Sequence, residues 1–184
     1  VDPPVEWLTR WIDDHLGRLD RDPDGTHLST DTEFLEKAGG ADESEVTAWN
    51  AQSPITRVNG GNDNRLGWTV PHVGSYIDQL KRLFRETARR RGWVWLWNKY
   101  ADWDHLFAHG YTLDGIMAVD GMWLWHHIQT DLPRGLGFVA PMASDFGAWK
   151  HWGKVPQREG IYAAADGVQT WRVAMWLLRA AQTQ

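Results

Sequence analysis

A helical spacing of apolar side chains is the feature that most limits how this chain can fold. From residue 5 to residue 19, large apolar side chains recur every three or four positions, as on the buried face of an amphipathic helix. The same spacing returns over residues 72–91, where Pro71 suits the first turn of a helix. Segments with the alternating pattern of a strand are few. We therefore predict a mainly α fold, with further helices over 30–38, 43–51, 94–109, 112–130 and 161–181.

Two segments without helical spacing interrupt this pattern. Residues 53–70 are rich in Gly and Asn, and residues 131–160 are rich in Gly and Pro, so we expect both to be long irregular loops. A chain of 184 residues lies in the usual size range of one domain. We expect a single compact helical domain over 1–184, with an acidic helix-loop-helix front over 1–50 and a Trp-rich helical body over 67–184.

Charge is distributed unevenly along the chain. The protein carries 19 Lys and Arg against 24 Asp and Glu, a formal net charge of -5. Residues 1–50 hold 13 acidic and four basic residues, a net charge of -9, and the remaining residues carry +4. Proteins that coat nucleic acid are normally basic. The overall charge therefore predicts that nucleic acid is an unlikely partner, although residues 81–99 hold seven bases against one acid.

Several protein classes are excluded by what the sequence lacks. There is no cysteine, so disulfides, thiolate metal sites and cysteine nucleophiles are ruled out. No apolar run approaches the ~20 residues that a membrane-spanning helix needs, so we expect no integral membrane protein. The N-terminal residues include acids where a secretory signal has bases. We therefore expect no signal peptide and synthesis in the cytoplasm.

An acidic segment after the first predicted helix has the spacing of a calcium-binding loop. In such twelve-residue loops, oxygen ligands at alternate positions surround one cation, glycine at position 6 makes the turn, and position 7 offers a carbonyl. Residues 20–31 place acids at positions 1, 3, 5 and 12, with Gly25 at position 6. The segment resembles EF-hand-type loops, and its final Asp is closer to the dockerin variant. An acidic turn without an ion is the alternative. The predicted ligands of a structural calcium ion are Asp20, Asp22, Asp24, Thr26 and Asp31.

A second resemblance lies in residues 55–62, ITRVNGGN, and in the VGSY sequence of residues 73–76. This pattern is similar to that of the plant-chitinase-type glycosidases (glycoside hydrolase family 19), which include phage endolysins. The resemblance implies that Asn59 lies in a sugar-binding cleft and hydrogen-bonds the substrate. His72 stands where the family has an arginine at the start of the following helix, and we include it among the substrate-binding candidates. A flexible loop closed by a helix start is the alternative.

Carboxylates that lie close to tryptophans in the sequence form the candidate catalytic group. A two-carboxylate glycosidase needs one acid in an apolar pocket that raises its pKa, and a second acid roughly 5–10 Å away. Asp102, Asp104 and Asp120 lie among several tryptophans and could supply this pair. Hydrogen bonding between packed helices is the alternative. His105 and His109, one helical turn apart, could share a metal ion or could serve only in packing.

The chain contains 14 tryptophans, far more than an ordinary share. Trp171 and Trp176 recur at helical spacing with other apolar residues, so we expect them in the core. Trp149 and Trp152 lie in a Gly-rich segment, and we expect exposed indole rings there. Such rings stack on sugars as readily as on bases and can also anchor a partner.

Three functions are compatible with these features. We favour a cell-wall glycan-directed protein of phage type: an endolysin-like glycoside hydrolase, or its binding portion, acting on polysaccharide or peptidoglycan at the bacterial cell wall. The first alternative is a non-enzymatic interaction or virion protein stabilised by calcium. The second is a nucleic-acid-associated protein that uses the basic, Trp-containing stretch 81–99 to stack on bases and follow phosphates.

Overall fold

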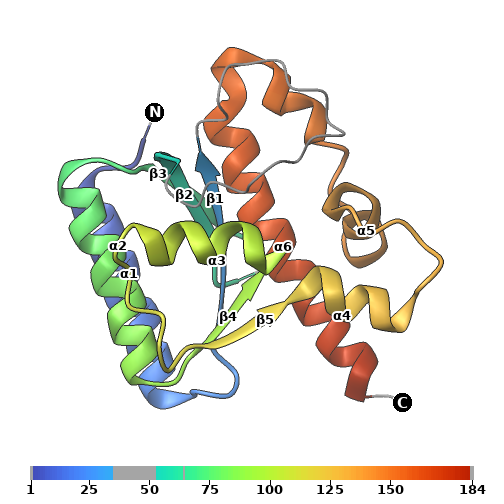
Figure 1. Ribbon diagram of the computed structural model, residues 1–184, viewed down its shortest axis with the longest axis horizontal. Helices are drawn as coiled ribbons and strands as arrows, with labels where there is room; N and C mark the ends of the chain where they lie inside the picture. The colour runs from blue at the N-terminus through green and yellow to red at the C-terminus, as the bar shows by residue number, and fades with distance from the viewer. Residues whose placement is uncertain (1, 35–52, 64, 183–184) are drawn as a thin grey trace.

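The computed structural model describes residues 2–34, 53–63 and 65–182. Its centre is a five-stranded mixed sheet in the order β3-β2-β1-β4-β5, which Figure 1 shows with helices around it. Strands β1, β2 and β3 are antiparallel neighbours, whereas β4 and β5 run parallel to β1. The strands are β1 (His27–Phe34), β2 (Ile55–Gly61), β3 (Gly67–Pro71), β4 (Trp93–Leu96) and β5 (Met117–Asp120).

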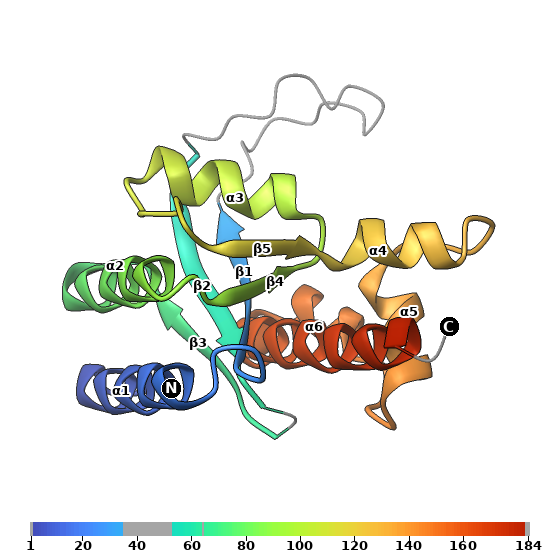
Figure 2. The same cartoon turned by 90° about the horizontal axis from the view of Figure 1, so that it is seen from below.

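Six α-helices surround this sheet in the part of the chain that the structure describes. Helices α1 and α2 lie side by side, and the long helix α6 crosses β3, β2 and β1 (Figure 2). Two short 3-10 helices, η1 (Lys150–Lys154) and η2 (Pro156–Arg158), lead into α6. The α-helices are α1 (Val5–Arg21), α2 (Gly74–Arg89), α3 (Lys99–Ala108), α4 (Gly121–Ile128), α5 (Leu136–Ala143) and α6 (Glu159–Gln182).

The alternation of side chains along the strands divides the interior into two apolar clusters. Leu28, Val58 and Val94 are fully buried with the apolar faces of α1 and α2. A second cluster joins α4, α5 and α6 around the buried rings of Trp125 and Trp149. Neighbouring residues of a strand face opposite sides of the sheet. The residues of β1 and β2 that alternate with these apolar residues therefore face α6. That face of the two strands is polar.

Small residues let α6 lie unusually close to the sheet. A Cβ atom on Gly167 would meet the backbone of Gly60 at 2.8 to 2.9 Å, and a Cβ on Gly67 would meet the carbonyl oxygen of Ala164 at 2.0 Å. The hydroxyl of Ser29 fixes the contact by donating to the Gly167 carbonyl at 2.7 Å. Helix α6 therefore carries Asp166, the residue before Gly167, against the polar face of β1.

The predicted mainly α fold is wrong. The protein has a mixed α/β architecture, and its acidic N-terminal part is not a helix-loop-helix unit because residues 27–34 form β1. The segment 53–70, expected to be a loop, contains β2 and β3. Its glycines leave room for α6 to pack closely on the sheet, and Asn59 contributes to the polar face. The segments 94–109 and 112–130 each divide into a strand followed by a helix.

Three of the predicted helices are present. The expected segments 5–19, 72–91 and 161–181 correspond to α1, α2 and α6. The expected helix at 43–51 lies outside the described residues, and the single-domain assignment stays a prediction. None of the helices among the described residues is both long and apolar enough to span a membrane.

Candidate metal centre

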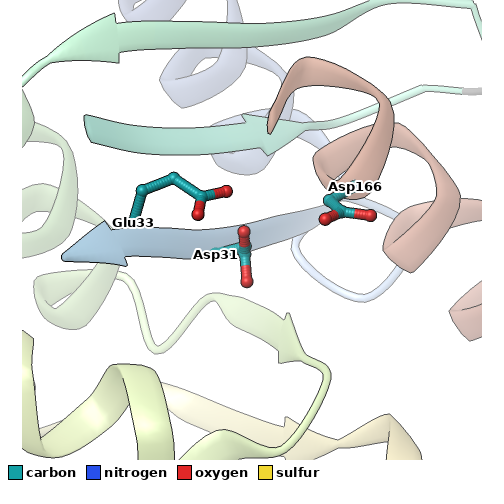
Figure 3. A group of neighbouring side chains, drawn as sticks. All are labelled: Asp31, Glu33 and Asp166. Carbon is teal, nitrogen blue, oxygen red and sulfur yellow. The ribbon is translucent and has the colours of Figure 1, made fainter. Parts of the chain in front are cut away.

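Three carboxylates converge at the contact between β1 and α6. Asp31 and Glu33 are two residues apart on β1, so their side chains leave the strand on the same face. Asp166 approaches them from α6, and Figure 3 shows the three side chains turned toward one another. One oxygen from each carboxylate lies within 4.8 Å of the others. We refer to Asp31, Glu33 and Asp166 as the carboxylate triad.

A buried amide holds two members of the triad in place. The Asn59 side-chain nitrogen donates to Asp31 Oδ2 at 2.9 Å and to Glu33 Oε1 at 3.2 Å. The Thr69 hydroxyl donates to Asn59 Oδ1 at 2.8 Å, and Arg57 Nε donates to that hydroxyl at 2.9 Å. Asn59 is 0 % exposed, so its amide is shielded from bulk solvent. Strands β2 and β3 thus fix the orientation of both β1 carboxylates.

Asp102 supports the same strand from the other side. Its Oδ1 accepts from the backbone nitrogen of Thr32 at 2.7 Å and from the Thr32 hydroxyl at 2.6 Å. Thr32 is the residue between Asp31 and Glu33. Burial raises the pKa of Asp102 to about 7, against the lowering effect of the two Thr32 hydrogen bonds. Asp102 therefore anchors the β1 segment that presents the triad.

The electrostatics of the triad favour a bound cation. Burial is the main cause that raises the pKa of Asp31 well above its ordinary value, and the nearby carboxylates of Asp102, Glu33 and Asp166 raise it further. The pKa of Glu33 is raised by burial and then by Asp166. Crowded carboxylates resist ionisation because their negative charges repel each other. A divalent cation among them would relieve that repulsion, and carboxylate oxygens are hard ligands. The residues present therefore fit a metal such as Mg²⁺, Mn²⁺ or Ca²⁺.

Asp166 accepts hydrogen bonds from two side chains outside the triad, an indole and an ammonium. Trp149 Nε1 donates to Asp166 Oδ1 at 2.7 Å, and Lys150 Nζ lies 2.7 and 2.9 Å from the two carboxylate oxygens. Tyr162, one helical turn earlier on α6, has its hydroxyl 3.4 Å from Lys150 Nζ. Burial is the first cause that raises the pKa of Tyr162, and the Asp166 charge adds to it, so this phenol stays protonated.

Cavities border the triad on two sides. One of about 530 Å³ is lined by Asp31 and Asp166 together with Trp97, Arg134 and Lys150. Another, of about 440 Å³, is lined by Glu33, Arg57 and Tyr162, among others. The triad is thus accessible to a ligand from both directions.

The predicted catalytic aspartates do not form one group. Asp102 lies behind the triad, and Asp104 is exposed on α3. Asp120 is the N-cap of α4: its side chain accepts from the backbone nitrogens of Met122 at 3.0 Å and Trp123 at 3.3 Å. Asp120 also accepts from the backbone of Lys99 at 2.9 Å. Its contacts are therefore those of a helix cap.

The predicted substrate-binding residues are also scattered. Asn59 lies under the triad, as described above, whereas His72 Nε2 lies 3.0 Å from the hydroxyl of Tyr111, away from it. Trp149, expected to be exposed, is only 1 % exposed and donates to Asp166. Trp152 is half-buried in the cluster that joins α4, α5 and α6.

The structure does not bring the predicted calcium ligands together. Asp20, at the end of α1, accepts from Arg90 Nε at 2.7 Å, and Asp22 closes a turn by accepting from the Gly25 nitrogen at 2.9 Å. Asp24 is exposed and Thr26 is buried. Asp31 lies within β1, where an extended backbone carries it away from that turn. Among the described residues, the triad is the only group of three or more acidic or histidine side chains placed to hold a metal.

The histidine pair on α3 has local partners. His105 Nδ1 lies 2.7 Å from the carbonyl oxygen of Ala101, and His109 Nδ1 lies 2.8 Å from that of His105. These are hydrogen bonds within one helix. Packing is therefore sufficient to explain the spacing of the two residues.

Glu33, Asp166, Lys150 and Tyr162 were not among the candidates from the sequence. Two local signals in the sequence mark Glu33, Asp166 and Tyr162, whereas neither of them marks Lys150. Asp31 and Glu33 alternate as on one face of a strand, and Tyr162 and Asp166 are one helical turn apart. The first signal was hidden because residues 30–38 were expected to be helical.

Comparisons with known proteins bear on the fold. No protein-family model matches the sequence, and no curated protein matches it. Among solved structures, the chain is similar in fold to the EXO domain of Nibbler from Aedes aegypti. The TM-score is 0.55 at 9 % sequence identity, and the match covers 88 % of this chain and 81 % of that one.

This likeness corrects the predicted function. The α/β fold resembles that of an EXO domain, which contradicts the predicted endolysin-like glycoside hydrolase and the predicted polysaccharide or peptidoglycan partner. The same likeness contradicts the expectation that nucleic acid is an unlikely partner, which was based on the net charge of the whole chain. Of the alternatives named from the sequence, a nucleic-acid-associated protein agrees best with the fold.

Proposed function

We propose that this chain is a metal-dependent nuclease that hydrolyses phosphodiester bonds at an end of a nucleic-acid strand. The observation that carries the proposal is the convergence of Asp31, Glu33 and Asp166 at one point. The likeness to an EXO domain supports nucleic acid as the substrate class. Release of nucleotides from the 3′ end is part of this proposal.

The proposed chemistry follows from the ligand set. Divalent cations held by carboxylates can polarise a phosphoryl oxygen and activate a water molecule for in-line attack. Asp31, Glu33 and Asp166 would hold the metal, and Asn59 keeps the first two oriented. Tyr162, whose raised pKa keeps its hydroxyl protonated, could donate a hydrogen bond to a substrate oxygen. We expect Mg²⁺ or Mn²⁺ in the working enzyme.

The cavity beside the triad suits a nucleotide. Trp97 offers an aromatic surface for a base, and the guanidinium of Arg134 and the ammonium of Lys150 can face phosphate. The basic stretch 81–99 is a weaker candidate for this role. Arg90 is already paired with Asp20 and Glu86, and the ring of Trp95 is buried.

A cleavage assay tests the proposal. Single-stranded DNA and RNA oligonucleotides carrying a label at either end are incubated with protein in Mg²⁺, Mn²⁺ or EDTA. We expect metal-dependent release of nucleotides from the 3′ end, reduced about 100-fold or more in D31N. The matched control is D104N, which removes an exposed acid from α3 and should leave the rate unchanged. Cleavage that persists in EDTA or in D31N would contradict the proposal, as would no cleavage in any metal.

A further inference from the structure

Lys150 is the basic residue that pairs with the triad. Its Nζ bridges both oxygens of Asp166, at 2.7 and 2.9 Å. These are the oxygens that a divalent cation would need as ligands. The lysine side chain is 43 % exposed and the Asp166 side chain only 7 %, so the ammonium covers a buried anion from the solvent side.

The two donors to Asp166 differ in their freedom to move. Trp149 is buried in the cluster that joins α4, α5 and α6, so its indole nitrogen is a fixed donor to Oδ1. The lysine head sits on a flexible four-carbon stem and is half-exposed. Asp166 would therefore keep its orientation through Trp149 if the ammonium left.

The lysine stem limits where the ammonium can go. A Cβ on Gly137 would meet Lys150 Cγ at 3.0 Å, which places the stem directly against α5. The ammonium lies 5.6 Å from the ring centroid of Trp149 and 5.2 Å from that of Tyr162, within the range of cation–π attraction. Lys150 also lines the 530 Å³ cavity with Arg134. That cavity is therefore within reach of a displaced ammonium.

We propose that the Lys150 ammonium is an exchangeable counter-ion that neutralises Asp166 in the metal-free protein and gives way to the divalent cation. Once displaced, it contacts the phosphate of the nucleotide in the neighbouring cavity. The inference rests on the proposed metal-dependent nuclease function. Its physical basis is that two cations competing for the same two carboxylate oxygens repel each other.

The competition can be measured without any activity. Isothermal titration with MnCl₂ is carried out on the wild type, K150M, K150R and K81M. K150M should bind Mn²⁺ about three- to tenfold more tightly than the wild type, because the competing charge is gone. K150R retains the charge and should bind no more tightly than the wild type. Lys81 also lies over a tyrosine ring, that of Tyr111, but on α2, and K81M should match the wild type.

The proposed contact between the Lys150 ammonium and phosphate needs a separate binding measurement. In saturating Mn²⁺, thymidine 5′-monophosphate has no phosphodiester bond to cleave and reports binding alone. K150M should bind it about fivefold more weakly than the wild type, whereas K81M should not differ.

The outcomes separate this inference from the proposed function. If the wild type binds Mn²⁺ and K150M binds it equally or more weakly, the counter-ion role is overturned while the nuclease proposal stands. Equal binding of thymidine 5′-monophosphate by K150M and the wild type overturns the phosphate contact. If the wild type binds no Mn²⁺, the metal-dependent function itself fails, and the role of Lys150 with it.

Discussion

Asn59 joins both β1 carboxylates to the neighbouring strands through one buried amide. Its nitrogen serves Asp31 and Glu33, and its oxygen accepts from Thr69, so each polar atom has a fixed partner. Groups of this kind orient metal ligands and often change metal affinity as much as the ligands do. The sequence pattern indicates Asn59 as a functional residue, but it predicts a hydrogen bond to a sugar substrate. The residue was identified, whereas its partners depend on a strand pairing that the local sequence does not reveal.

The variant N59A should lose metal affinity and nuclease rate by about 10- to 100-fold. Without the amide, Asp31 and Glu33 repel each other with no donor between them. Asn62 is the matched control because it is also buried but contacts His15 Nδ1, at 3.2 Å, away from the triad. Both N59A and N62A should lower the melting temperature, yet only N59A should weaken Mn²⁺ binding in a calorimetric titration. Equal Mn²⁺ affinity in the two variants would show that Asn59 does not orient the metal ligands.

At the level of elements, the close contact between α6 and β2 positions the site. Gly167 lies over Gly60 with no room for a side chain, and the adjacent Asp166 takes its position from this contact. Helices α1, α2 and α6 could be predicted because each repeats apolar residues at helical spacing. Strands β1 and β2 could not, because β1 is rich in polar residues and the glycines of β2 are typical of a loop. Their strand conformation depends on sheet pairing and on the helix above them.

The variant G167A tests the close approach of α6. Its Cβ would lie 2.8 Å from the Gly60 nitrogen, so the helix must move away from the strand. We expect a loss of about 1–3 kcal/mol in the free energy of unfolding and a melting temperature several degrees lower. G147A, where a Cβ meets nothing within 4 Å, is the control and should melt like the wild type. Weakened Mn²⁺ binding should accompany the destabilisation in G167A, and an unchanged melting temperature would contradict the packing.

Across the whole molecule, buried carboxylates and a buried histidine change the stability of the fold with pH in opposite directions. The raised pKa values of Asp31, Glu33 and Asp102 mean that the folded protein binds protons more tightly than the unfolded chain, so these groups reduce stability as pH rises. His15 acts in the opposite sense. Burial, followed by the charge of Arg18, lowers its pKa from 6.5 to about 4. The net charge of the chain reveals neither effect, because both depend on which groups are buried.

His15 gives a pH dependence that a single variant can isolate. Its folded pKa lies below its unfolded value, so its contribution to stability is complete above pH 6.5 and is lost as pH falls toward 4. The wild type should therefore lose roughly 2–3 kcal/mol more than H15Q between pH 7 and pH 4. Urea unfolding of both proteins across this range, in the presence of EDTA, measures the difference. Parallel stability curves would show that His15 does not titrate as described.

The position of Mn²⁺ in a crystal of this protein, found from its anomalous scattering, shows directly whether the carboxylate triad binds a metal. We expect a peak among the carboxylates of Asp31, Glu33 and Asp166, with the Lys150 ammonium moved off Asp166, and no such peak in D31N crystals treated in the same way. A Mn²⁺ peak found only elsewhere, or no peak at saturating concentration, would show that the triad is not a metal site.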